Sequence, residues 1–444
     1  MPRDSNTADL GPADEAPTAG RLRWRRFLPF FGRPPALTRH QWRLIGVLGA
    51  ANLIDGYDLA VMGLALPQIQ QGLGIADADI GGITAFLRLG VVPAMLLTLL
   101  ADHIGRRRLV LLTILGFTLS TFLTAFARDA REFAALQFLA RLFIAGETML
   151  SIVVIAEELD ATTRGWGIGM LAALGSVGHG LASLVFALVN RLPFGWRALY
   201  VVGVVPLLLL AWFRRSLRET HRFEAHRRSR GERSRGIHGI LQPLANLARM
   251  YPGRLLALCA ALFPVAFVVE TALLFVSKTL QESHGYKPET VALLYITVGA
   301  MAPIGNLLAG VFGDRVGRKR VLITGILVNS AAVWLFYNSR GMWVPPMFGL
   351  MLVTVTMVTT LFAALGSELF PTSYRSTASG VRQIIATAGA ALGLWSEGRL
   401  FAAEGSHAAA ISMMLVLMPV APVLVGLFLP ETANLELEAI APEI

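Results

Sequence analysis

Two carboxylates stand within an apolar segment that is long enough to cross a lipid bilayer. Asp55 and Asp58 lie in the stretch NLIDGYDLAV, between Leu44 and Pro67. A charge at the bilayer centre costs roughly 3 kcal/mol. Residues three apart on a helix project within about 60° of each other, and two nearby carboxylates in a low dielectric do not both ionise cheaply. One of the two is therefore expected to load and unload a proton near neutral pH, as a proton-coupling group must.

Two arginines lie inside other apolar segments. Arg88 is near the middle of ITAFLRLGVV, and Arg141 lies in a later segment. An arginine does not discharge by losing its proton, and its planar guanidinium suits a carboxylate. Arg88 is therefore expected either to bind an anionic substrate or to serve as the standing counter-ion of Asp55 or Asp58. Arg141 is a second substrate-binding candidate, although a structural ion pair is the favoured role for it.

Three further ionisable residues in apolar segments are candidates for proton coupling. Glu147 shares a segment with Arg141 but lies six residues away, so the two point in different directions. His179, in GSVGHGLAS, either relays a proton or is a packed, hydrogen-bonded histidine. Glu270 is a candidate through the internal repeat described below. Tyr57 and Gln383 are candidates for substrate contact: Tyr57 as part of an aromatic cavity, Gln383 as a polar group about two turns into a late segment.

The composition excludes an ordinary soluble protein. Of 444 residues, 55% are hydrophobic and only 15% are charged, whereas soluble domains are about a quarter charged. The net charge of +10 comes from basic clusters on alternate loops. This positive-inside pattern places both termini and the central loop in the cytoplasm and argues against nucleic-acid binding. The single cysteine, Cys259, excludes an internal disulfide and a cysteine metal site. Length and arginine content fit a bacterial cytoplasmic (inner) membrane.

The apolar segments predict an all-α membrane protein with about twelve transmembrane helices. The expected spans are 42–67, 79–101, 109–127, 133–157, 165–190, 196–213, 254–280, 291–312, 321–338, 344–367, 377–400 and 407–429. The expected regions are a partly disordered cytosolic tail at 1–40, a six-helix bundle at 41–213, a basic and partly helical cytosolic linker at 214–253, a second six-helix bundle at 254–429 and a cytosolic tail at 430–444.

The two halves of the chain repeat. ADHIGRRR recurs as GDRVGRKR, and Asp314 follows Asp102 by 212 residues; LRET and LPET are separated by the same offset. The pair Glu157 and Arg164 recurs as Glu368 and Arg375, 211 residues later. Parallel repeats of this kind form two pseudo-symmetric bundles around a central site. At the 212-residue offset Asp58 corresponds to Glu270.

The repeated loop motif resembles the hallmark of the major facilitator superfamily, Gly-x3-Asp-Arg-x-Gly-Arg-Lys. The second copy matches it fully, with Gly310, Asp314, Arg315, Gly317, Arg318 and Lys319. The first copy carries Asp102, Gly105, Arg106 and Arg107, but has Thr98 for the first glycine and His103 for the first basic residue. The resemblance covers residues 40–440. A charge-paired latch at these loops is expected to stabilise one orientation of the bundles, so these residues are assigned to gating.

Finer resemblances concern function. DGYD resembles a signature of aromatic-acid:proton symporters, and AGETMLSIVVIAEELDATTRG resembles a segment of metabolite:proton symporters. ELFPTSYRS and LPET also occur in sugar-porter-like and organic-ion transporters. The arginine of the family's fourth-helix motif aligns with Gln137, while Arg141 lies one turn further in.

The expected function is proton-coupled import of a small organic anion, such as an aromatic or other carboxylate, by alternating access. The alternatives are a sugar or polyol:proton symporter and a proton-driven exporter of amphipathic compounds. A membrane enzyme is disfavoured because Walker A, HExxH and GxSxG motifs and metal-ligand clusters are missing from the sequence. The expected partners are a small-molecule substrate, protons and the lipid bilayer, without cofactor or metal, and the expected working form is a monomer.

Overall fold

The protein folds as a set of long helices, as the sequence predicts. The computed structural model describes residues 35–94, 97, 106–203, 238–371, 374–433 and 435. All regular structure in these residues is helical, and each of the twelve expected spans contains helix. Eight of the described helices are long and apolar enough to cross a membrane.

The first half supplies six named helices, followed by helical residues at 196–203. They are α1 (Arg39–Leu64), α2 (Leu66–Leu73), α3 (Asp77–Leu89), α5 (Arg106–Thr124), α6 (Ala130–Glu158) and α7 (Ala161–Phe186). The start of α6 is fixed by Asp129, whose side chain accepts hydrogen bonds from the backbone N–H groups of Arg131 and Glu132. Such a cap satisfies donors that the first turn of a helix leaves open.

The second half begins with a helix in the segment that joins the two halves. Its elements are α10 (His238–Met250), α11 (Pro252–Lys278) continued by a π-helical turn η4 (Thr279–Ser283), α12 (Pro288–Gly299), α13 (Ala302–Val316), α14 (Arg318–Asn338), α15 (Val344–Glu368), α16 (Arg375–Glu404), α17 (His407–Met414) and α18 (Val420–Phe428). The expected span at 291–312 is two helices, α12 and α13. Pro303 lies in the first turn of α13, where its missing N–H is tolerated although it interrupts a continuous helix.

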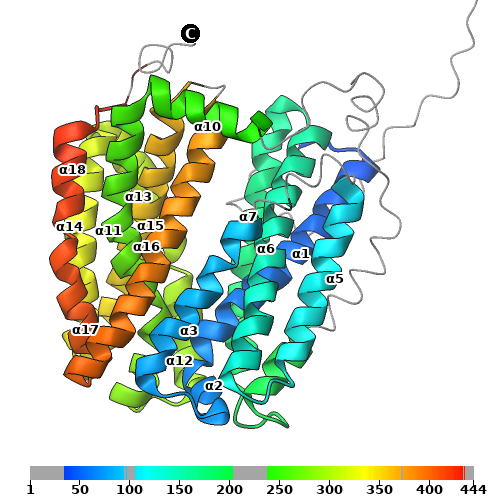
Figure 1. Ribbon diagram of the computed structural model, residues 1–444, viewed down its shortest axis with the longest axis vertical. Helices are drawn as coiled ribbons and strands as arrows, with labels where there is room; N and C mark the ends of the chain where they lie inside the picture. Colours follow the sequence, from blue (N-terminus) through cyan, green and yellow to red (C-terminus); the bar gives the residue numbers. More distant parts are fainter. Residues whose placement is uncertain are drawn as a thin grey trace, which may run out of the picture. The chain divides into compact units, whose positions relative to one another are not determined.

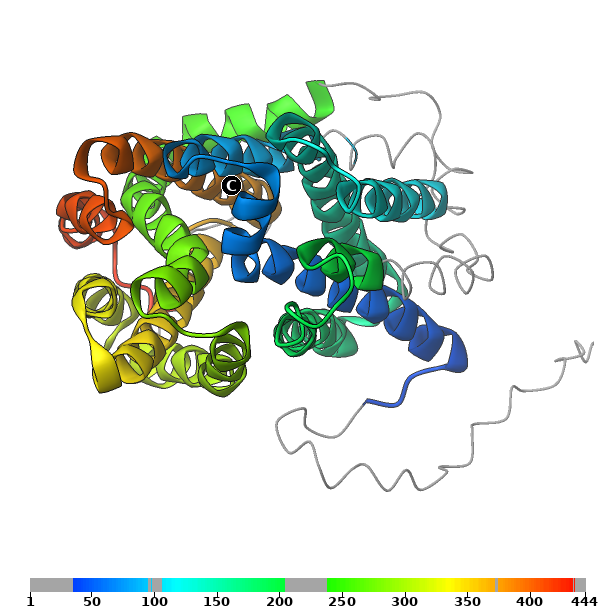
Figure 2. The ribbon, with the colours of Figure 1, turned by 90° about the horizontal axis from the view of Figure 1, so that it is seen from below.

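Figures 1 and 2 show how the helices of His40–Ile444 are grouped. In both views α1, α5, α6 and α7 lie on one side and α11, α14, α15, α16 and α18 on the other. Helix α3 packs against α16, and α12 packs against α7. We name the two ends of this arrangement by their short helices: the α10 end and the α2 end, upper and lower in Figure 1.

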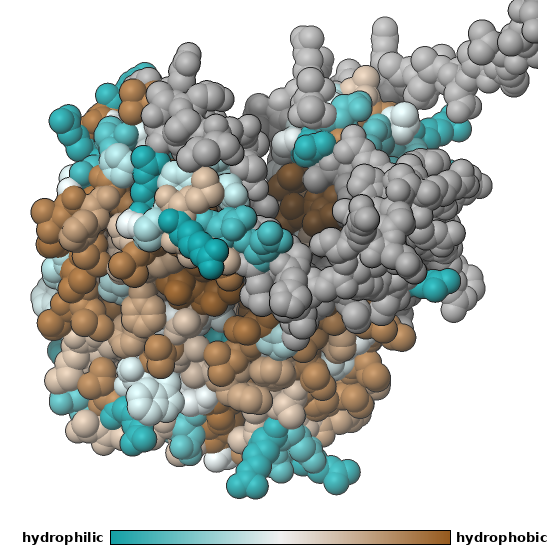
Figure 3. Space-filling view, turned by 45° about the horizontal axis from the view of Figure 1, so that its top comes forward, coloured by the Kyte–Doolittle hydropathy of each residue, from teal (hydrophilic) through white to brown (hydrophobic). Residues whose placement is uncertain are grey.

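The outer surface is apolar along the sides of the helices. Large hydrophobic side chains are exposed there, among them Leu115 at 65%, Leu307 at 63% and Leu427 at 72%. Figure 3 shows apolar residues over the sides and hydrophilic residues gathered toward the ends. An exposed apolar surface of this kind matches the hydrocarbon core of a bilayer.

Glycine brings α1 and α7 into close contact beside the two aspartates. A Cβ atom at Gly178 of α7 would fall on the backbone carbonyl oxygen of Leu53, and one at Gly56 of α1 would fall on that of Gly175. Small residues at helix interfaces in membranes permit such backbone approach. Gly178, which precedes His179, therefore serves helix packing, as the sequence indicates.

A matched pair of glycines tests this contact. Gly178→Ala should destabilise the protein by about 1 to 3 kcal/mol, because the added methyl group cannot be accommodated without moving a helix. Gly180, on the same helix, has open space around its Cβ position, so Gly180→Ala should leave stability unchanged or slightly raised. Thermal unfolding of the purified variants measures both effects. Equal stability of the two variants would contradict the close packing of α1 against α7.

Candidate functional site

An ion pair connects the two halves of the chain in the interior of the helix arrangement. A guanidinium nitrogen of Arg88, near the end of α3, lies 2.8 Å from a carboxylate oxygen of Glu270 in α11. The two side chains are 31% and 35% exposed, so small molecules or water reach the pair. The counter-ion of Arg88 is thus Glu270. Asp58 and Asp55 contact the hydroxyl groups of Thr121 on α5 and Thr148 on α6.

Arg141 and Asp58 extend this pair into a cluster of four charged groups. Arg141, on α6, interacts electrostatically with Arg88, Asp58 and Glu270. Its Cβ atom lies beside Gly90, just beyond the end of α3. We call Arg88, Arg141, Asp58 and Glu270 the central charge cluster. It draws on four helices: α3, α6, α1 and α11.

The Asp58 carboxylate is buried, and only one of its two oxygens accepts a hydrogen bond from a described residue. The side chain is 2% exposed, and one carboxylate oxygen accepts a hydrogen bond of 3.2 Å from the Thr121 hydroxyl of α5. The other oxygen has no hydrogen-bond partner among the described residues. The hydroxyl of Tyr200, 1% exposed and also without a hydrogen-bond partner there, interacts electrostatically with Asp58.

Asp55 and Glu147 lie deeper in the first group of helices. Asp55 is 3% exposed, and an oxygen of its carboxylate lies 3.5 Å from the Thr148 hydroxyl of α6. Glu147, which precedes Thr148 in the chain, is fully buried. The two aspartates of DGYD therefore contact different hydroxyl groups: Asp58 that of Thr121 on α5, and Asp55 that of Thr148 on α6.

The remaining sequence candidates lie apart from the central charge cluster or are engaged in packing. Tyr57 is 3% exposed and donates a hydrogen bond of 2.8 Å to the backbone carbonyl of Leu199. His179 is exposed, and its Nδ1 atom lies 3.0 Å from the carbonyl oxygen of Gly175 in its own helix. Gln383 is an exposed residue of α16. Their roles in substrate binding or proton coupling stay predictions.

The second copy of the loop motif is joined to two other motifs of the chain. The Glu431 carboxylate of LPET accepts hydrogen bonds from the backbone N–H groups of Arg318, at 2.8 Å, and Lys319, at 3.3 Å. It thereby caps the first turn of α14, where a negative charge is favoured. The Arg318 guanidinium forms an ion pair with Glu368, whose carboxylate also accepts a hydrogen bond of 2.7 Å from the Thr432 hydroxyl.

Asp314, Gly310 and Arg315 are further described residues of this motif. Arg318 also approaches Asp314 at 3.4 Å, and Gly310 has open space at its Cβ position. Arg315 ends α13 as a basic residue of its last turn. In the first copy, Asp102 and Gly105 and the side chains of Arg106 and Arg107 lie outside the described residues.

Gly317 is the residue of the loop motif that has the strictest conformational requirement. Its φ angle is +111°, and a Cβ atom there would lie 2.5 Å from a carboxylate oxygen of Glu431. Gly317→Ala should therefore destabilise the protein by about 1 to 3 kcal/mol, because other residues rarely adopt this backbone conformation. Gly310→Ala is the control from the same motif. Thermal unfolding compares the two, and an unchanged melting temperature for Gly317→Ala would contradict the contact with Glu431.

A second polar cluster lies at the α2 end, and sequence reasoning missed it. Lys278, at the end of α11, is 1% exposed and binds Asp77, Gln70 and Glu282. A lysine that is almost fully buried is rare unless it is paired. From sequence, Lys278 and Asp77 read as ordinary residues at segment ends, because nothing local shows that the two halves meet there.

No group of three or more His, Cys, Asp or Glu side chains that could hold a metal ion occurs in the part of the chain that the structure describes. Two permanent cations and two acids lie where α3 and α11 meet, between the two halves.

Comparison with known proteins defines the class. The sequence model of the Major Facilitator Superfamily matches residues 48–304 and 256–441. The chain therefore belongs to this superfamily, and the resemblance drawn from the loop motif is confirmed. The xylose transporter XylE from E. coli, in an inward-open conformation, has the same fold, with a TM-score of 0.72 at 17% identity, over 90% of this chain and 99% of that one. The protein is a multi-pass membrane transporter and not an enzyme.

The chain is similar to relatives that are named as transporters of small metabolites. The probable 4-methylmuconolactone transporter of Cupriavidus pinatubonensis is 27% identical over 74% of this chain and 76% of its own length. The cis,cis-muconate transport protein of Acinetobacter baylyi is 25% identical over 80% and 86%. The gallate transporter of Pseudomonas putida is 29% identical over 44% and 43%.

Proposed function

We propose that the protein is a proton-coupled symporter that imports a small organic anion, an aromatic or unsaturated carboxylate. The Arg88–Glu270 ion pair carries this proposal. It joins the two halves, it is partly exposed, and its guanidinium is already engaged with a carboxylate. A substrate carboxylate has the shape and charge to take the place of Glu270 on Arg88.

Charge balance explains why a proton would travel with the anion. With both acids ionised, the two arginines and two acids of the central charge cluster sum to zero. A proton bound by Asp58 or Glu270 leaves a net charge of +1, which one substrate carboxylate neutralises. Because an uncompensated charge inside a membrane protein is costly, anion binding and proton binding favour each other. This mutual preference is the thermodynamic basis of symport.

The two acids differ in how each would take up the proton. Glu270 becomes free to bind a proton when the substrate displaces it from Arg88. Asp58 is buried beside Arg141, and its open carboxylate oxygen gives a proton a place to bind without displacement of a partner. We assign proton coupling to Asp58 first, with Glu270 second.

The repeat supplies the machinery for alternating access. We infer that residues 41–213 and 254–429 form two six-helix bundles around the central charge cluster, joined by the basic linker at 214–253. Residues 1–40 and 430–444 are the tails. The α10 end then faces the cytoplasm of a bacterium and the α2 end faces outward. The contacts of Arg318 with Glu368 and of Glu431 with α14 lie at the cytoplasmic end, where they bias the bundle orientation.

Relatives support the substrate class. Proteins named as transporters of muconate, gallate and 4-methylmuconolactone share this chain's family. Muconate and gallate are carboxylates, one an unsaturated chain and the other an aromatic ring. An apolar carbon skeleton with one or two carboxylates fits a site that offers guanidinium groups among apolar helices. Sugars carry no charge and would leave the Arg88–Glu270 pair without a role in recognition.

Ligand-dependent thermal stabilisation tests the substrate class. The purified protein is heated with benzoate, gallate, cis,cis-muconate, xylose, a polyol and an organic cation in separate samples. A ligand that binds only the folded protein stabilises it by about 2.7 kcal/mol at a hundred times its Kd. Stabilisation by carboxylates alone is the expected result. Stabilisation by xylose or by the cation, with none from carboxylates, would overturn the proposed substrate class.

A further inference from the structure

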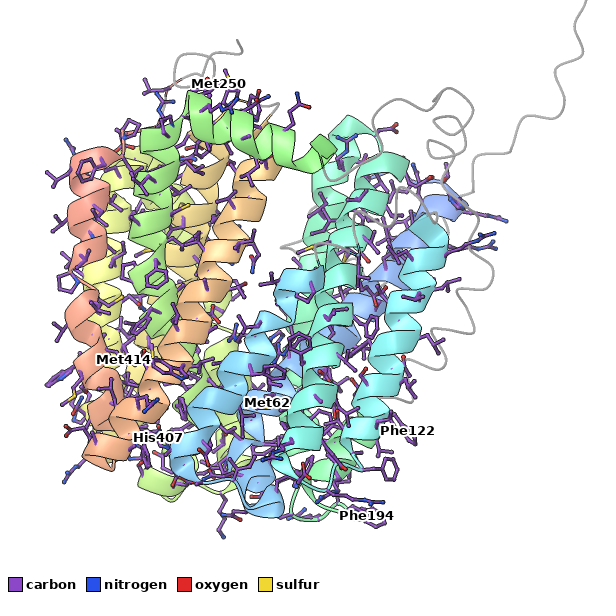
Figure 4. The ribbon with its side chains drawn as sticks, viewed as in Figure 1. Met62, Phe122, Phe194, Met250, His407 and Met414 are labelled. Carbon is purple, nitrogen blue, oxygen red and sulfur yellow. The ribbon has the colours of Figure 1, made fainter. Side chains whose placement is uncertain are left out.

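A histidine at the α2 end is held between two aromatic rings and two carboxylates. The ring centroid of His407 lies 4.2 Å from that of Phe401 and 4.5 Å from that of Phe275. Its Nδ1 atom lies 2.5 Å from a carboxylate oxygen of Glu397, and its Nε2 atom lies 3.7 Å from Asp77. In Figure 4, His407 lies at the opposite end of the helices from Met250.

The partners of this histidine differ in burial. Glu397, on α16, has no exposed surface, and one of its carboxylate oxygens has no hydrogen-bond partner among the described residues. His407 itself is 12% exposed and Asp77 is 39% exposed. A buried carboxylate needs a positive partner or a proton of its own, and His407 is the group that lies beside Glu397. Protons can reach the histidine from the solvent at this end.

Asp77 joins the halves of the chain. It stands at the start of α3 in the first half and binds Lys278 of the second half at 2.8 Å. It also accepts a hydrogen bond of 2.6 Å from Gln70. Burial would raise the pKa of Asp77, but hydrogen bonds from Lys278 and Gln70 outweigh burial, so the pKa lies below its ordinary value. Asp77 is therefore an anion throughout the physiological pH range.

We propose that His407, with Glu397, is a second proton-binding site, separate from the central charge cluster, whose protonation closes the α2 end of the transporter. A neutral His407 that donates Nδ1–H to Glu397 presents a lone pair on Nε2 to Asp77. A protonated His407 presents an N–H on both ring nitrogens and attracts Glu397 and Asp77 together. Protonation thus adds an attraction between α17 in the second half and α3 in the first.

Every charged or titratable group packed around His407 acts on this balance. Asp77 of α3 and Glu397 of α16 favour the protonated ring. Lys278 of α11 opposes it, and Glu282 of η4 offsets part of the Lys278 charge through a contact of 2.7 Å. Tyr337 of α14 interacts electrostatically with Glu397, and its hydroxyl is committed to the carbonyl oxygen of Ala272. The near neighbours of His407 thus include two carboxylates and one ammonium group.

The direction of the effect follows from the groups that titrate. Contact between His407 and Asp77 strengthens as the pH falls, because a proton on the ring gives Nε2 an N–H that faces the Asp77 carboxylate. The contact weakens again only at strongly acidic pH, once Asp77 binds a proton, because a carboxylate with a lowered pKa loses its stabilising charge last.

Distance measurements between spin labels at the α2 end test this proposal without any substrate. Labels are placed at the exposed positions Gln71 in α2 and Ala403 in α16, as cysteines in a Cys259→Ser background, and the protein is studied in lipid nanodiscs. Between pH 8.5 and pH 5.5 the ratio of closed to open molecules should rise by about two- to fivefold, the range for a partly exposed charge pair. His407→Gln should abolish the pH dependence.

Two further variants make the result specific. His284 lies at the same end, and burial and the nearby Arg340 lower its pKa, so His284→Gln should retain the wild-type pH dependence. Asp77→Asn removes the acceptor and should abolish the dependence even if His407→Gln fails to fold. Wild-type distances that do not change with pH would overturn the proposal, as would a dependence that persists in His407→Gln or in Asp77→Asn. An Asp58→Asn background removes the proton site of the proposed function, and the change that depends on His407 should persist there, so that the two proposals fail independently.

Discussion

Replacement of Arg88 by glutamine is expected to weaken the binding of carboxylate substrates by about ten- to a hundredfold. A hydrogen bond to a charged group contributes about 1.5 to 3 kcal/mol, and each 1.4 kcal/mol is a factor of ten in affinity. Arg88 offers the partly exposed guanidinium of the central charge cluster, held 2.8 Å from Glu270. Ligand titration of the purified variant, followed by thermal shift or calorimetry, measures the loss.

Arg88→Gln also leaves Glu270 without its cation. The effect of the substitution on stability must therefore be measured separately from its effect on substrate binding. In the double variant Arg88→Gln with Glu270→Gln, both charges are gone, and the cost of leaving the partly exposed Glu270 carboxylate unpaired disappears. The double variant should regain stability relative to Arg88→Gln and still bind carboxylates weakly. Arg88→Lys keeps the charge without the planar fork and should fall between wild type and Arg88→Gln. Normal affinity in the double variant would reduce the ion pair to a structural link.

Asp58→Asn is expected to abolish uptake driven by a pH gradient while exchange of labelled for unlabelled substrate continues. Asparagine keeps the shape of the side chain and the contact with Thr121 but cannot bind a proton. Without a proton to carry, the loaded transporter still moves between its two orientations, and net accumulation against a gradient stops. Uptake in proteoliposomes with and without an imposed pH gradient, together with counterflow at equal pH, distinguishes the two activities.

A control from the same half shows that the effect belongs to this position. Asp79→Asn changes an exposed carboxylate in the first turn of α3 and should leave both activities intact. If Asp58→Asn accumulates substrate at the normal rate, Asp58 is not the coupling group, and Glu270 or Glu147 takes its place. If exchange is lost as well, Asp58 acts in substrate binding.

The helices and their class could be predicted because membrane insertion imposes a simple rule on the sequence. A span needs about twenty apolar residues, and every expected span from 42–67 to 407–429 contains helix. Hydropathy does not predict the break between α12 and α13, because the segment around Pro303 remains apolar enough to cross a membrane. The repeat of ADHIGRRR and GDRVGRKR resembles the loop motif of the superfamily, and the match of the superfamily's sequence model confirms the resemblance.

The partners within the site were less predictable, because they depend on contacts between distant helices. The repeat offset drew attention to Glu270, but nothing local shows that Arg88 of the first half reaches it rather than Asp55 or Asp58. Glu431 and Glu368 were noted only as parts of motifs, and their contacts with Arg318 bring together three segments far apart in the chain. Aromatic side chains often line cavities, which is why the sequence predicts Tyr57 near the substrate. In the structure its hydroxyl donates a hydrogen bond to the backbone carbonyl of Leu199.

The polar cluster at the α2 end shows the same limit. Asp77, Lys278 and His407 each stand at the end of an apolar segment, where charged residues are ordinary. Lys278 and Glu397 differ from ordinary residues at segment ends because they are buried. Their burial depends on how α3 packs against α11 and α16. Sequence alone contains no signal of that meeting.

Proton movement driven by substrate is the most direct test of symport. Proteoliposomes without any pH gradient receive cis,cis-muconate or gallate outside, and a pH-sensitive dye inside reports proton entry; liposomes with Arg88→Gln correct for passive permeation. The account predicts acidification of the interior when the carboxylate is added, lost in Asp58→Asn. Uptake of the carboxylate without acidification, or with alkalinisation, would contradict proton symport.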